Sequence, residues 1–261
     1  NIMILIEKTE VIGFEQAIRG MRNPMNSWDK SDSGICKGGD SGIGCDNCAA
    51  AYLTPGESTC GHQYDHSFQI GKNDHELMMK LVKGGPVHAK FRRMIAVYVD
   101  ITAPLYWWKE FDTYKVGTVA NSCSTMHKIH EKKFTLEDFS IDHLEALTNI
   151  ETDNKIIGKF GPTQSFNTSS MGVILITIDA LNFYRNLYLE TKDKKYWWQM
   201  IQLLPSSYNQ KRTVMLNYEV LANIYQYRKN HKLDEWKEFC KWIEGLPWSE
   251  IITCSVSEEE S

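Results

Sequence analysis

Apolar residues recur at helical spacing along much of the chain, and the predicted helices outnumber the predicted strands. A helix is predicted from Asn73, as its N-cap, to Gly84, because the apolar residues between them share one face. The segment Arg93–Ile101, RMIAVYVDI, is rich in β-branched and aromatic residues and predicts a buried strand. The other predicted elements are a strand over Ile2–Ile6 and helices over Phe14–Met21, Pro104–Phe111, Leu136–Asn149, Val173–Tyr188, Val214–Lys229 and Asp234–Glu244.

The order of these elements predicts one domain over residues 1–261, an α/β body with more helix than strand. The sequence contains no internal repeat and no composition shift that would mark a second domain. Residues 31–67 differ from the rest because they are rich in glycine and cysteine and have no apolar periodicity. We interpret this segment as an insertion within the domain rather than a part of its core.

Composition and charge restrict the possible partners. The chain has 261 residues, of which 42% are hydrophobic and 24% charged, with a formal net charge of −4. This balance disfavours a nucleic-acid polymer, which selects basic surfaces, whereas a single nucleotide needs only a few local cations. No apolar run reaches the roughly 20 residues of a membrane span, and the N-terminal sequence does not resemble a secretory signal. Seven cysteines, an odd number, fit a reducing compartment, and we expect a cytoplasmic protein.

Four of the cysteines cluster in the insertion as Cys36-x8-Cys45-x2-Cys48-x11-Cys60. A Cys-x2-Cys turn can present two thiolates to one tetrahedral metal, and the neighbouring glycines let the backbone wrap around it. The cluster predicts a structural zinc site with these four ligands and with His62 as a substitute. Two alternatives stay open, incidental thiols in a loop or two disulfides, because the outer spacings match no standard zinc finger.

The segment Pro104–Lys128, PLYWWKEFDTYKVGTVANSCSTMHK, joins three consecutive aromatic residues to many small polar ones. We predict that Tyr106, Trp107 and Trp108 pack in the core or at a subunit contact rather than stack on a ligand ring. The polar residues that follow carry more hydrogen-bonding groups than a core segment needs. Asp112–Met126 is therefore predicted to form a ligand-binding loop.

The C-terminal part of the chain carries a resemblance to a known family. The stretch Leu203–Ile243, LLPSSYNQKRTVMLNYEVLANIYQYRKNHKLDEWKEFCKWI, is similar to the flavin-dependent thymidylate synthases of the ThyX type. The family has a Leu-Pro, a basic residue, and then an Asn, a second Asn and an Arg. The matching positions, without a gap, are Leu204-Pro205, Lys211, Asn217, Asn223 and Arg228.

Helical spacing supports part of this match. Asn217 and Arg228 would lie on one face of the predicted helix, at the two ends of an apolar stripe. Such polar groups are costly to bury unless each meets a partner, and a nucleotide or a flavin edge could be that partner. The alternative is that Arg228 lies solvated in the last helical turn, where the helix dipole favours a cation.

A second part of the resemblance covers Asn73–Met126, where the order and spacing of the family's landmarks hold with about one residue inserted. Ala103-Pro104 matches the family's Ala-Pro, and Asn121 and Ser124 stand at its Asn and Ser. The signature itself departs from the family. Lys109-Glu110 replaces an Arg-Gln, Thr113-Tyr114-Lys115 replaces an Arg-His-Arg, Met126 replaces a later Arg, and Arg92 or Arg93 stands near a lost His.

The resemblance implies an α+β fold in which helices pack on a small, mostly antiparallel sheet, and a homotetramer whose sites form between subunits. It also implies an activity. A one-carbon unit would pass from methylenetetrahydrofolate to C5 of a pyrimidine deoxynucleotide, as from dUMP to dTMP or in a related modification such as hydroxymethylation. FAD would be the cofactor and NADPH the reductant, so no cysteine nucleophile is needed.

The resemblance also assigns roles to individual residues. Arg228, Ser124 and Glu110 are the expected catalytic residues, although Ser124 would orient the nucleotide rather than attack it. Cofactor binding is assigned to Lys115, Asn121, Asn217, Asn223 and Arg93, and substrate binding to Lys109, Ser122, Lys211 and Arg228. The lost arginines leave an alternative open, because removing a guanidinium fork that grips phosphate is not a conservative change. The chain would then be a catalytically lapsed nucleotide-binding or regulatory protein on the same fold.

Overall fold

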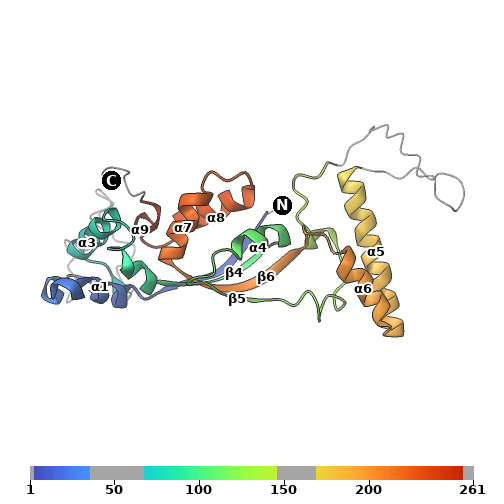
Figure 1. Ribbon diagram of the computed structural model, residues 1–261, viewed down its shortest axis with the longest axis horizontal. Coiled ribbons are helices and arrows are strands. Elements are labelled where there is room, and N and C mark those ends of the chain that lie inside the picture. The colour runs from blue at the N-terminus through green and yellow to red at the C-terminus, as the bar shows by residue number, and fades with distance from the viewer. Residues whose placement is uncertain (1–2, 36–67, 146–168, 255–261) are drawn as a thin grey trace, which may run out of the picture. The chain divides into compact units, whose positions relative to one another are not determined.

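The computed structural model describes residues 3–35, 68–145 and 169–254 (Figure 1). The described elements, with η for 3₁₀ turns, are β1 (Leu5–Ile12), α1 (Phe14–Arg22), η1 (Asn23–Met25), η2 (Trp28–Lys30), β2 (Gly34–Ile35), β3 (Phe68–Gln69), α3 (Lys72–Lys83), η4 (Lys90–Met94), β4 (Ala96–Pro104), α4 (Leu105–Phe111), β5 (Val119–Ser122), η5 (Leu136–Asp138), α5 (Ser170–Thr191), α6 (Lys194–Leu203), β6 (Asn209–Asn217), α7 (Tyr218–Arg228), α8 (Asp234–Glu244) and α9 (Glu250–Thr253).

Four strands form one sheet in the order β1-β4-β6-β5, and β2 pairs with β3 in a separate two-stranded ladder. The two central strands of the larger sheet run antiparallel. At one end of the pair the amide of Tyr218 donates to the carbonyl of Ile95 (3.1 Å), and at the other the amide of Leu105 donates to that of Tyr208 (3.0 Å). The predicted α+β fold, with helices on a small and mostly antiparallel sheet, is confirmed.

The described chain packs as two compact units that are interleaved in sequence. Unit 1 contains Asn1–Leu5, Ile101–Thr113 and Asn121–Arg212, and unit 2 contains Ile6–Asp100, Tyr114–Ala120 and Thr213–Ser261. β4 and β6 each contribute residues to both units. One domain over residues 1–261 stays a prediction.

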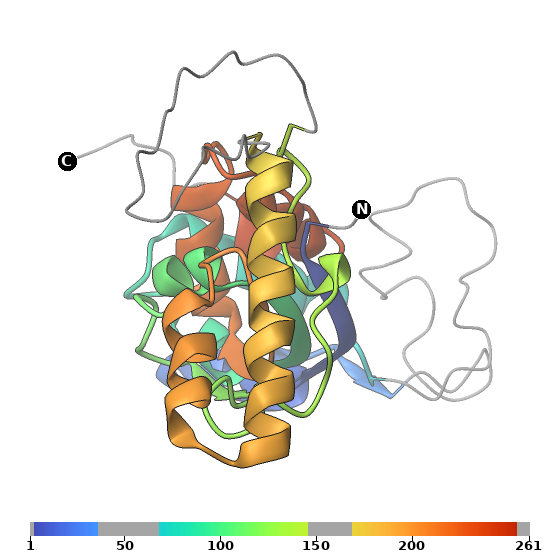
Figure 2. The same cartoon turned by 90° about the vertical axis from the view of Figure 1, so that its right-hand side faces the viewer.

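In unit 1 the helices α5 and α6 lie side by side, as both views show (Figures 1 and 2). They share a core with the segment after β5, built from Ile129, Phe134, Phe139, Ile174, Ile178, Leu181 and Met200. The aromatic row on α4 belongs to the interior as well. Trp107 and Trp108 are at most 1% exposed, which confirms core packing for these two tryptophans.

In unit 2 the helix α7 packs against α8, α9 and η4, and α1 packs against η4. Tyr218, Trp236 and Phe239 are fully buried in this unit. The hydroxyl of Tyr218 donates to the carbonyl of Pro247 (2.6 Å), so this buried polar group has a partner. The helices predicted over Phe14–Met21 and Asp234–Glu244 are confirmed as α1 and α8.

The helix predicted over Val214–Lys229 is wrong in its first part, because residues up to Asn217 belong to β6. Val214 and Leu216 are buried on one side of the strand, and the short apolar run reads equally well with either period. Asn217 is the N-cap of α7, so it does not share a helix face with Arg228. A strand and a helix therefore replace one long helix.

The predicted start of the helix at Asn73 is also wrong. α3 begins at Lys72, and Asp32, from a loop 41 residues earlier in the sequence, accepts hydrogen bonds from the amides of Asn73 (2.9 Å) and Asp74 (3.1 Å). Asp74, which is fully buried, in turn accepts from the hydroxyls of Ser31 (2.7 Å) and Ser33 (2.6 Å). These reciprocal bonds fix the start of the insertion to the N-terminus of α3.

Other element boundaries differ from the predictions. β1 begins later than the strand predicted over Ile2–Ile6, and β4 begins at Ala96, because Arg93 lies in η4. Within Leu136–Asn149 the described residues form only the 3₁₀ turn η5, closed by a capping box between Thr135 and Asp138. Among the described residues no helix is long and apolar enough to cross a bilayer. A cytoplasmic location stays a prediction.

Candidate functional site

Two segments far apart in sequence meet in unit 2. The side chain of Tyr114 contacts Arg228 at the C-terminal end of α7, and the backbone of Gly117 lies against Asn217 at its N-terminal end. The stretch Tyr114–Gly117 therefore runs along α7. Tyr114 and Lys115 belong to the segment that replaces the family's Arg-His-Arg. The matched Asn and Arg residues belong to α7 and its N-cap. The structure therefore brings together the two parts of the resemblance.

Arg228 is held between aromatic side chains. Its Nε donates to the hydroxyl of Tyr114 at 2.9 Å, and its Cζ lies 4.8 Å from the ring centroid of Trp236 and 5.7 Å from that of Tyr114. A guanidinium over an aromatic face gains cation–π energy and loses less freedom than a lysine would when it orders. Arg228 is half-buried. Arg228 lies in the last turn of α7, as the alternative had it, but its contacts with Tyr114 and Trp236 show that it is not freely solvated.

Asn217 has a structural task that its sequence position did not reveal. Its Oδ1 accepts from the amide of Val220 (3.0 Å) and caps α7. Its Nδ2 faces Gly117, where an added Cβ would lie 2.8 Å from that nitrogen. Gly117 also has φ +80°, a backbone conformation that favours glycine.

One hydroxyl in the same segment has no hydrogen-bond partner among the described residues. Thr118 Oγ1 is buried and unpaired within that part of the chain, although buried polar groups are nearly always paired. The cation of Lys115 and the amide of Asn223, both exposed, lie on the same two segments. These two segments thus carry a hydroxyl, a cation and an amide that a polar ligand could use.

Arg93, the remaining predicted cofactor residue of unit 2, is engaged with a carboxylate. Its Nη2 lies 3.5 Å from Glu219 Oε1, and Arg92 Nη2 lies 3.1 Å from Oε2 of the same residue. Burial lowers the pKa of the Arg92 guanidinium, and Glu219 opposes that shift. The two arginines and one carboxylate together carry one net positive charge at the first turn of α7.

The other predicted residues lie in unit 1, on α4, on β6 and in the stretch Asn121–Ser124. In that stretch Asn121, Ser122 and Ser124 are exposed, and the amide of Cys123 donates to the carbonyl of Lys211 (2.9 Å). Ser124 Oγ accepts from the amide of His127 (2.9 Å) and so closes the following turn. β5 ends at Ser122, so the predicted loop Asp112–Met126 contains a strand.

The helix α4 places Lys109 and Glu110 at its last turn, with Lys109 exposed and Glu110 half-buried. Sequence reasoning missed two neighbours of the predicted residues, Trp236 in unit 2 and Gln210 in unit 1. Trp236 was attributed only to the apolar stripe of its helix. Gln210 carried no signal, because its strand, β6, was not predicted.

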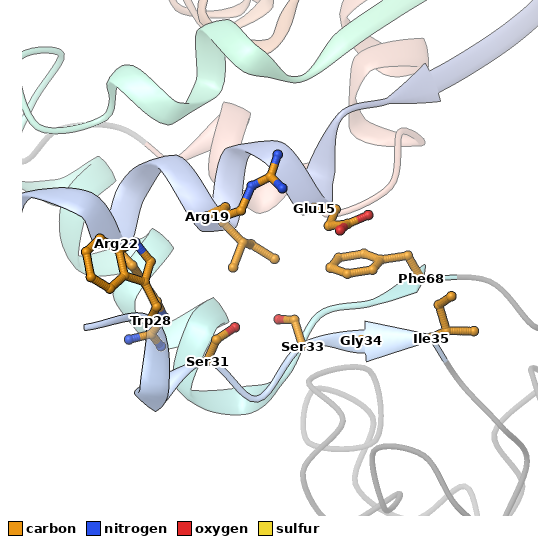
Figure 3. Close-up of a pocket in the computed structure, with 10 residues that line it drawn as sticks. Glu15, Arg19, Arg22, Trp28, Ser31, Ser33, Gly34, Ile35 and Phe68 are labelled. Atoms are coloured by element: carbon orange, nitrogen blue, oxygen red, sulfur yellow. The ribbon is translucent and has the colours of Figure 1, made fainter. Parts of the chain in front are cut away.

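A pocket of about 290 Å³ lies elsewhere in unit 2, between α1 and the stretch that leads into the insertion (Figure 3). Arg19 and Glu15 approach it from α1, with Ser33 and Phe68 on the opposite side. Ser33 there donates to the buried Asp74, which also forms an ion pair with Arg22 (2.6 Å). None of the residues predicted for the site lines this pocket.

The predicted zinc ligands Cys36, Cys45, Cys48 and Cys60 lie outside the described residues. Among residues 3–35, 68–145 and 169–254, no group of three or more His, Cys, Asp or Glu side chains lies close enough together to hold a metal ion.

No protein-family model and no curated protein sequence matches the chain. Solved structures do. Thymidylate Synthase X (ThyX) from Helicobacter pylori, in a structure with FAD and dUMP, superposes with a TM-score of 0.56 over 98% of this chain and 99% of that one, at 14% identity. This chain has the ThyX fold. The resemblance seen in the sequence is thereby confirmed at the level of the fold.

A second solved structure has the same fold. The UMP/dUMP methylase PolB from Streptomyces cacaoi, bound with 5-Br UMP, superposes with a TM-score of 0.54 at 11% identity, over 96% of this chain and 92% of that one. Each of the two superpositions covers at least 96% of this chain.

Proposed function

We propose that this protein binds FAD and a pyrimidine nucleotide and transfers a one-carbon unit to C5 of the nucleotide. The proposal is supported above all by the contact between Tyr114 and Arg228, two residues 114 positions apart. One belongs to the degraded signature and the other to the well-matched C-terminal block. The proteins of the same fold, ThyX with FAD and dUMP and a UMP/dUMP methylase, support the same class of substrate.

The residues along α7 fit a flavin nucleotide. The hydroxyl of Thr118, which has no partner among the described residues, would form a hydrogen bond with the ligand. Lys115 would supply a cation for a phosphate, and Asn223 would supply an amide for a ring edge. Asn217 and Arg93 would contribute beside them, with Asn217 limited to its Nδ2 because its Oδ1 caps the helix. When bound, FAD would supply the hydride that completes the methyl group.

The residues that the resemblance assigns to the substrate would bind the nucleotide. Arg228 would bind an anionic or carbonyl group, oriented by Tyr114, and the stretch Asn121–Ser124 would offer hydroxyls and an amide. Lys109 and Lys211 would supply charge for the phosphate. Glu110 would hydrogen-bond the base or ribose, since a carboxylate next to a phosphate is repelled.

Two co-substrates complete the proposed reaction. NADPH would reduce the flavin, and methylenetetrahydrofolate would donate the one-carbon unit. The protein's own contribution would be orientation and electrostatic stabilisation, because the flavin carries the difficult chemistry. Nucleotide binding without turnover is the second candidate, and it is favoured by the exchange of the Arg-His-Arg for Thr113-Tyr114-Lys115.

The two candidates are separated by colour and turnover. Purified protein that carries FAD absorbs at about 450 nm, and NADPH bleaches that band if reduction occurs. Incubation with methylenetetrahydrofolate and dUMP, UMP or dCMP, followed by mass spectrometry of the nucleotide, then identifies the substrate. Methylated product supports the enzyme, and dUMP binding without product supports the lapsed protein. Colourless protein that takes up no FAD overturns the flavoenzyme.

We propose self-association through α5, in line with a homotetramer. This helix is apolar on more than one side: Ile174, Ile178 and Leu181 are buried, whereas Val173, Ile176 and Phe183 are 49–58% exposed. The exposed three lie at spacings of three and seven, hence on one face. A helix that is apolar all round is typically buried, and a second copy of the chain would cover this face.

We also propose a structural zinc in the insertion. The four cysteines would supply all ligands, so this metal would support folding rather than catalysis. Elemental analysis should find about one zinc per chain, and Cys45→Ser should reduce it. Metal-free protein with all four thiols titratable would exclude both the zinc and the disulfides.

A further inference from the structure

A continuous set of hydrogen bonds connects the end of α4 with the stretch Asn121–Ser124 in unit 1. Gln210 is only 7% exposed, and both ends of its amide are used. Its Nε2 donates to the carbonyl of Cys123 (2.8 Å), and its Oε1 accepts from Arg212 Nε (3.0 Å). Arg212 Nη1 donates to Asp112 Oδ1 (2.6 Å), at the C-cap of α4.

The amide of Gln210 can satisfy these two neighbours in one orientation only. The guanidinium of Arg212 can only donate, and the carbonyl of Cys123 can only accept. A reversed amide would place two donors face to face on one side and two acceptors on the other, at the cost of two partly buried hydrogen bonds. Gln210 therefore transmits the position of Arg212 to the backbone of Cys123.

Arg212 is itself immobilised. Its Cζ lies 4.2 Å from the ring centroid of Trp108, and its side chain is 14% exposed. Trp108 is buried and donates from Nε1 to the carbonyl of Gln210 (2.9 Å). The charge of Arg212 is balanced by Asp112 where it stands, which suits a guanidinium that holds protein groups in place rather than a phosphate.

Both backbone polar groups of Cys123 are fixed by β6: its amide donates to Lys211, and its carbonyl accepts from Gln210. Cys123 lies between Ser122 and Ser124, and the proposed function assigns nucleotide binding to these two serines. We infer that Gln210 and Arg212 are positioning residues, which set the backbone at Cys123 and so aim both serines at the pyrimidine nucleotide. This inference rests on the proposed function.

The test uses Gln210→Glu in the full chain. A carboxylate still accepts from Arg212 but cannot donate to the carbonyl of Cys123. We expect the amides of residues 122–124 to exchange hydrogen about tenfold faster, and the Kd for dUMP to rise about tenfold by calorimetry. Gln226→Glu on the exposed side of α7 brings the same charge change and should leave both quantities at the wild-type value.

Arg212→Lys is the second variant, and it decides the matter if Gln210→Glu does not fold. Lysine keeps the ion pair with Asp112 but loses the planar stacking on Trp108 and the Nε bond to Gln210, so a smaller rise in the same two quantities is expected. Wild-type dUMP affinity in either folded variant overturns the inference, whatever the exchange rates. If the wild-type protein binds no dUMP, the proposed function fails. The hydrogen-exchange rates of residues 122–124 in the variants then decide whether Gln210 and Arg212 hold the backbone at Cys123.

Discussion

Arg228 donates a hydrogen bond to the hydroxyl of Tyr114 across 2.9 Å, so a residue retained from the ThyX pattern is held by one that departs from it. Tyr114 stands in the middle of the Thr-Tyr-Lys that replaces Arg-His-Arg. A phenol can accept from a guanidinium and also offer it a π face. The residue that departs from the family is therefore in direct contact with the retained arginine.

Replacement of Tyr114 by Phe tests this contact. The variant keeps the ring beside Trp236 and removes only the acceptor for Arg228 Nε. We expect the free energy of unfolding to fall by about 1 kcal/mol, and the affinity for dUMP to fall about tenfold because Arg228 loses its orientation. Urea denaturation and calorimetry measure the two effects.

The control for this change is Tyr227→Phe, one residue before Arg228 and 71% exposed, which removes a hydroxyl from the same helix. It should leave both quantities unchanged. If Tyr114→Phe binds dUMP with wild-type affinity, Arg228 does not depend on this hydrogen bond.

The sequence predicted long, strongly periodic helices well and strands poorly. α8 matches its predicted bounds because its apolar stripe is unbroken between an acidic first turn and Gly245. β6 was absorbed into a predicted helix because Val214–Asn217 is too short a run to fix its own period. The contacts that placed it in the sheet, such as the bond from Tyr218 to Ile95, join residues more than 100 positions apart.

Gly117→Ala should disturb the capping of α7. Gly117 has φ +80°, where a Cβ costs about 1–2 kcal/mol, and that Cβ would press on Asn217 Nδ2 at 2.8 Å. Displacing the cap costs about another 1 kcal/mol. Urea denaturation of the variant measures the sum of the two effects.

Gly85→Ala separates these two costs. Gly85 has φ +90°, and an added Cβ would meet nothing within 4 Å. This control carries the backbone strain without the clash, so it should lose less stability than Gly117→Ala. Equal losses in both variants would show that Asn217 accommodates the methyl group.

Asp74→Asn should destabilise unit 2. Burial alone would raise the pKa of this carboxyl, but hydrogen bonds from Ser33, Ser31 and Arg22 outweigh burial and leave it below its ordinary value of 3.8. The amide leaves Arg22, which is 4% exposed, without its counter-charge. We expect a loss of about 3–5 kcal/mol in the free energy of unfolding at pH 7.

The pH dependence follows from the sign of that shift. A depressed pKa means that the ionised carboxylate stabilises the fold above pH 3.8, and that this contribution disappears as the pH falls through the folded-state pKa. The gap between wild type and Asp74→Asn should therefore narrow below about pH 4. Glu76→Gln, on the exposed side of the same helix, should show neither effect. A gap that is constant with pH would argue against the buried ion pair.

Phe183→Glu should weaken self-association. Phe183 is 58% exposed on the apolar face of α5, and a charge there would have to be buried in the proposed subunit contact. Light scattering coupled to size exclusion should report a smaller particle than for wild type. Val87→Glu, a change at a residue of unit 2 that is 71% exposed, should leave the particle size unchanged. A monomeric wild-type protein would refute the α5 contact outright.

The candidate site was only partly accessible from the sequence. Arg228 was found because its spacing from Asn217 and Asn223 matches the family pattern, and no pattern pointed to the Trp236 ring that lies beside it. Ser124 was assigned a ligand, but no pattern showed that its oxygen also closes a turn with His127. Hydrogen bonds of this local kind depend on the backbone path, which residue types do not determine.

The paired strands β2 and β3 have a consequence for how this protein can change. Gly34 lies opposite Gln69, and Ile35 lies opposite Phe68, so the chain leaves and re-enters at neighbouring points. Closing a loop between fixed neighbours costs only slightly more free energy as the loop grows. We therefore expect that residues 36–67 can be shortened to a hairpin turn, or replaced by a segment of another length. The hydrogen bonds from Ser31 and Ser33 to Asp74 would still anchor the chain just before this segment.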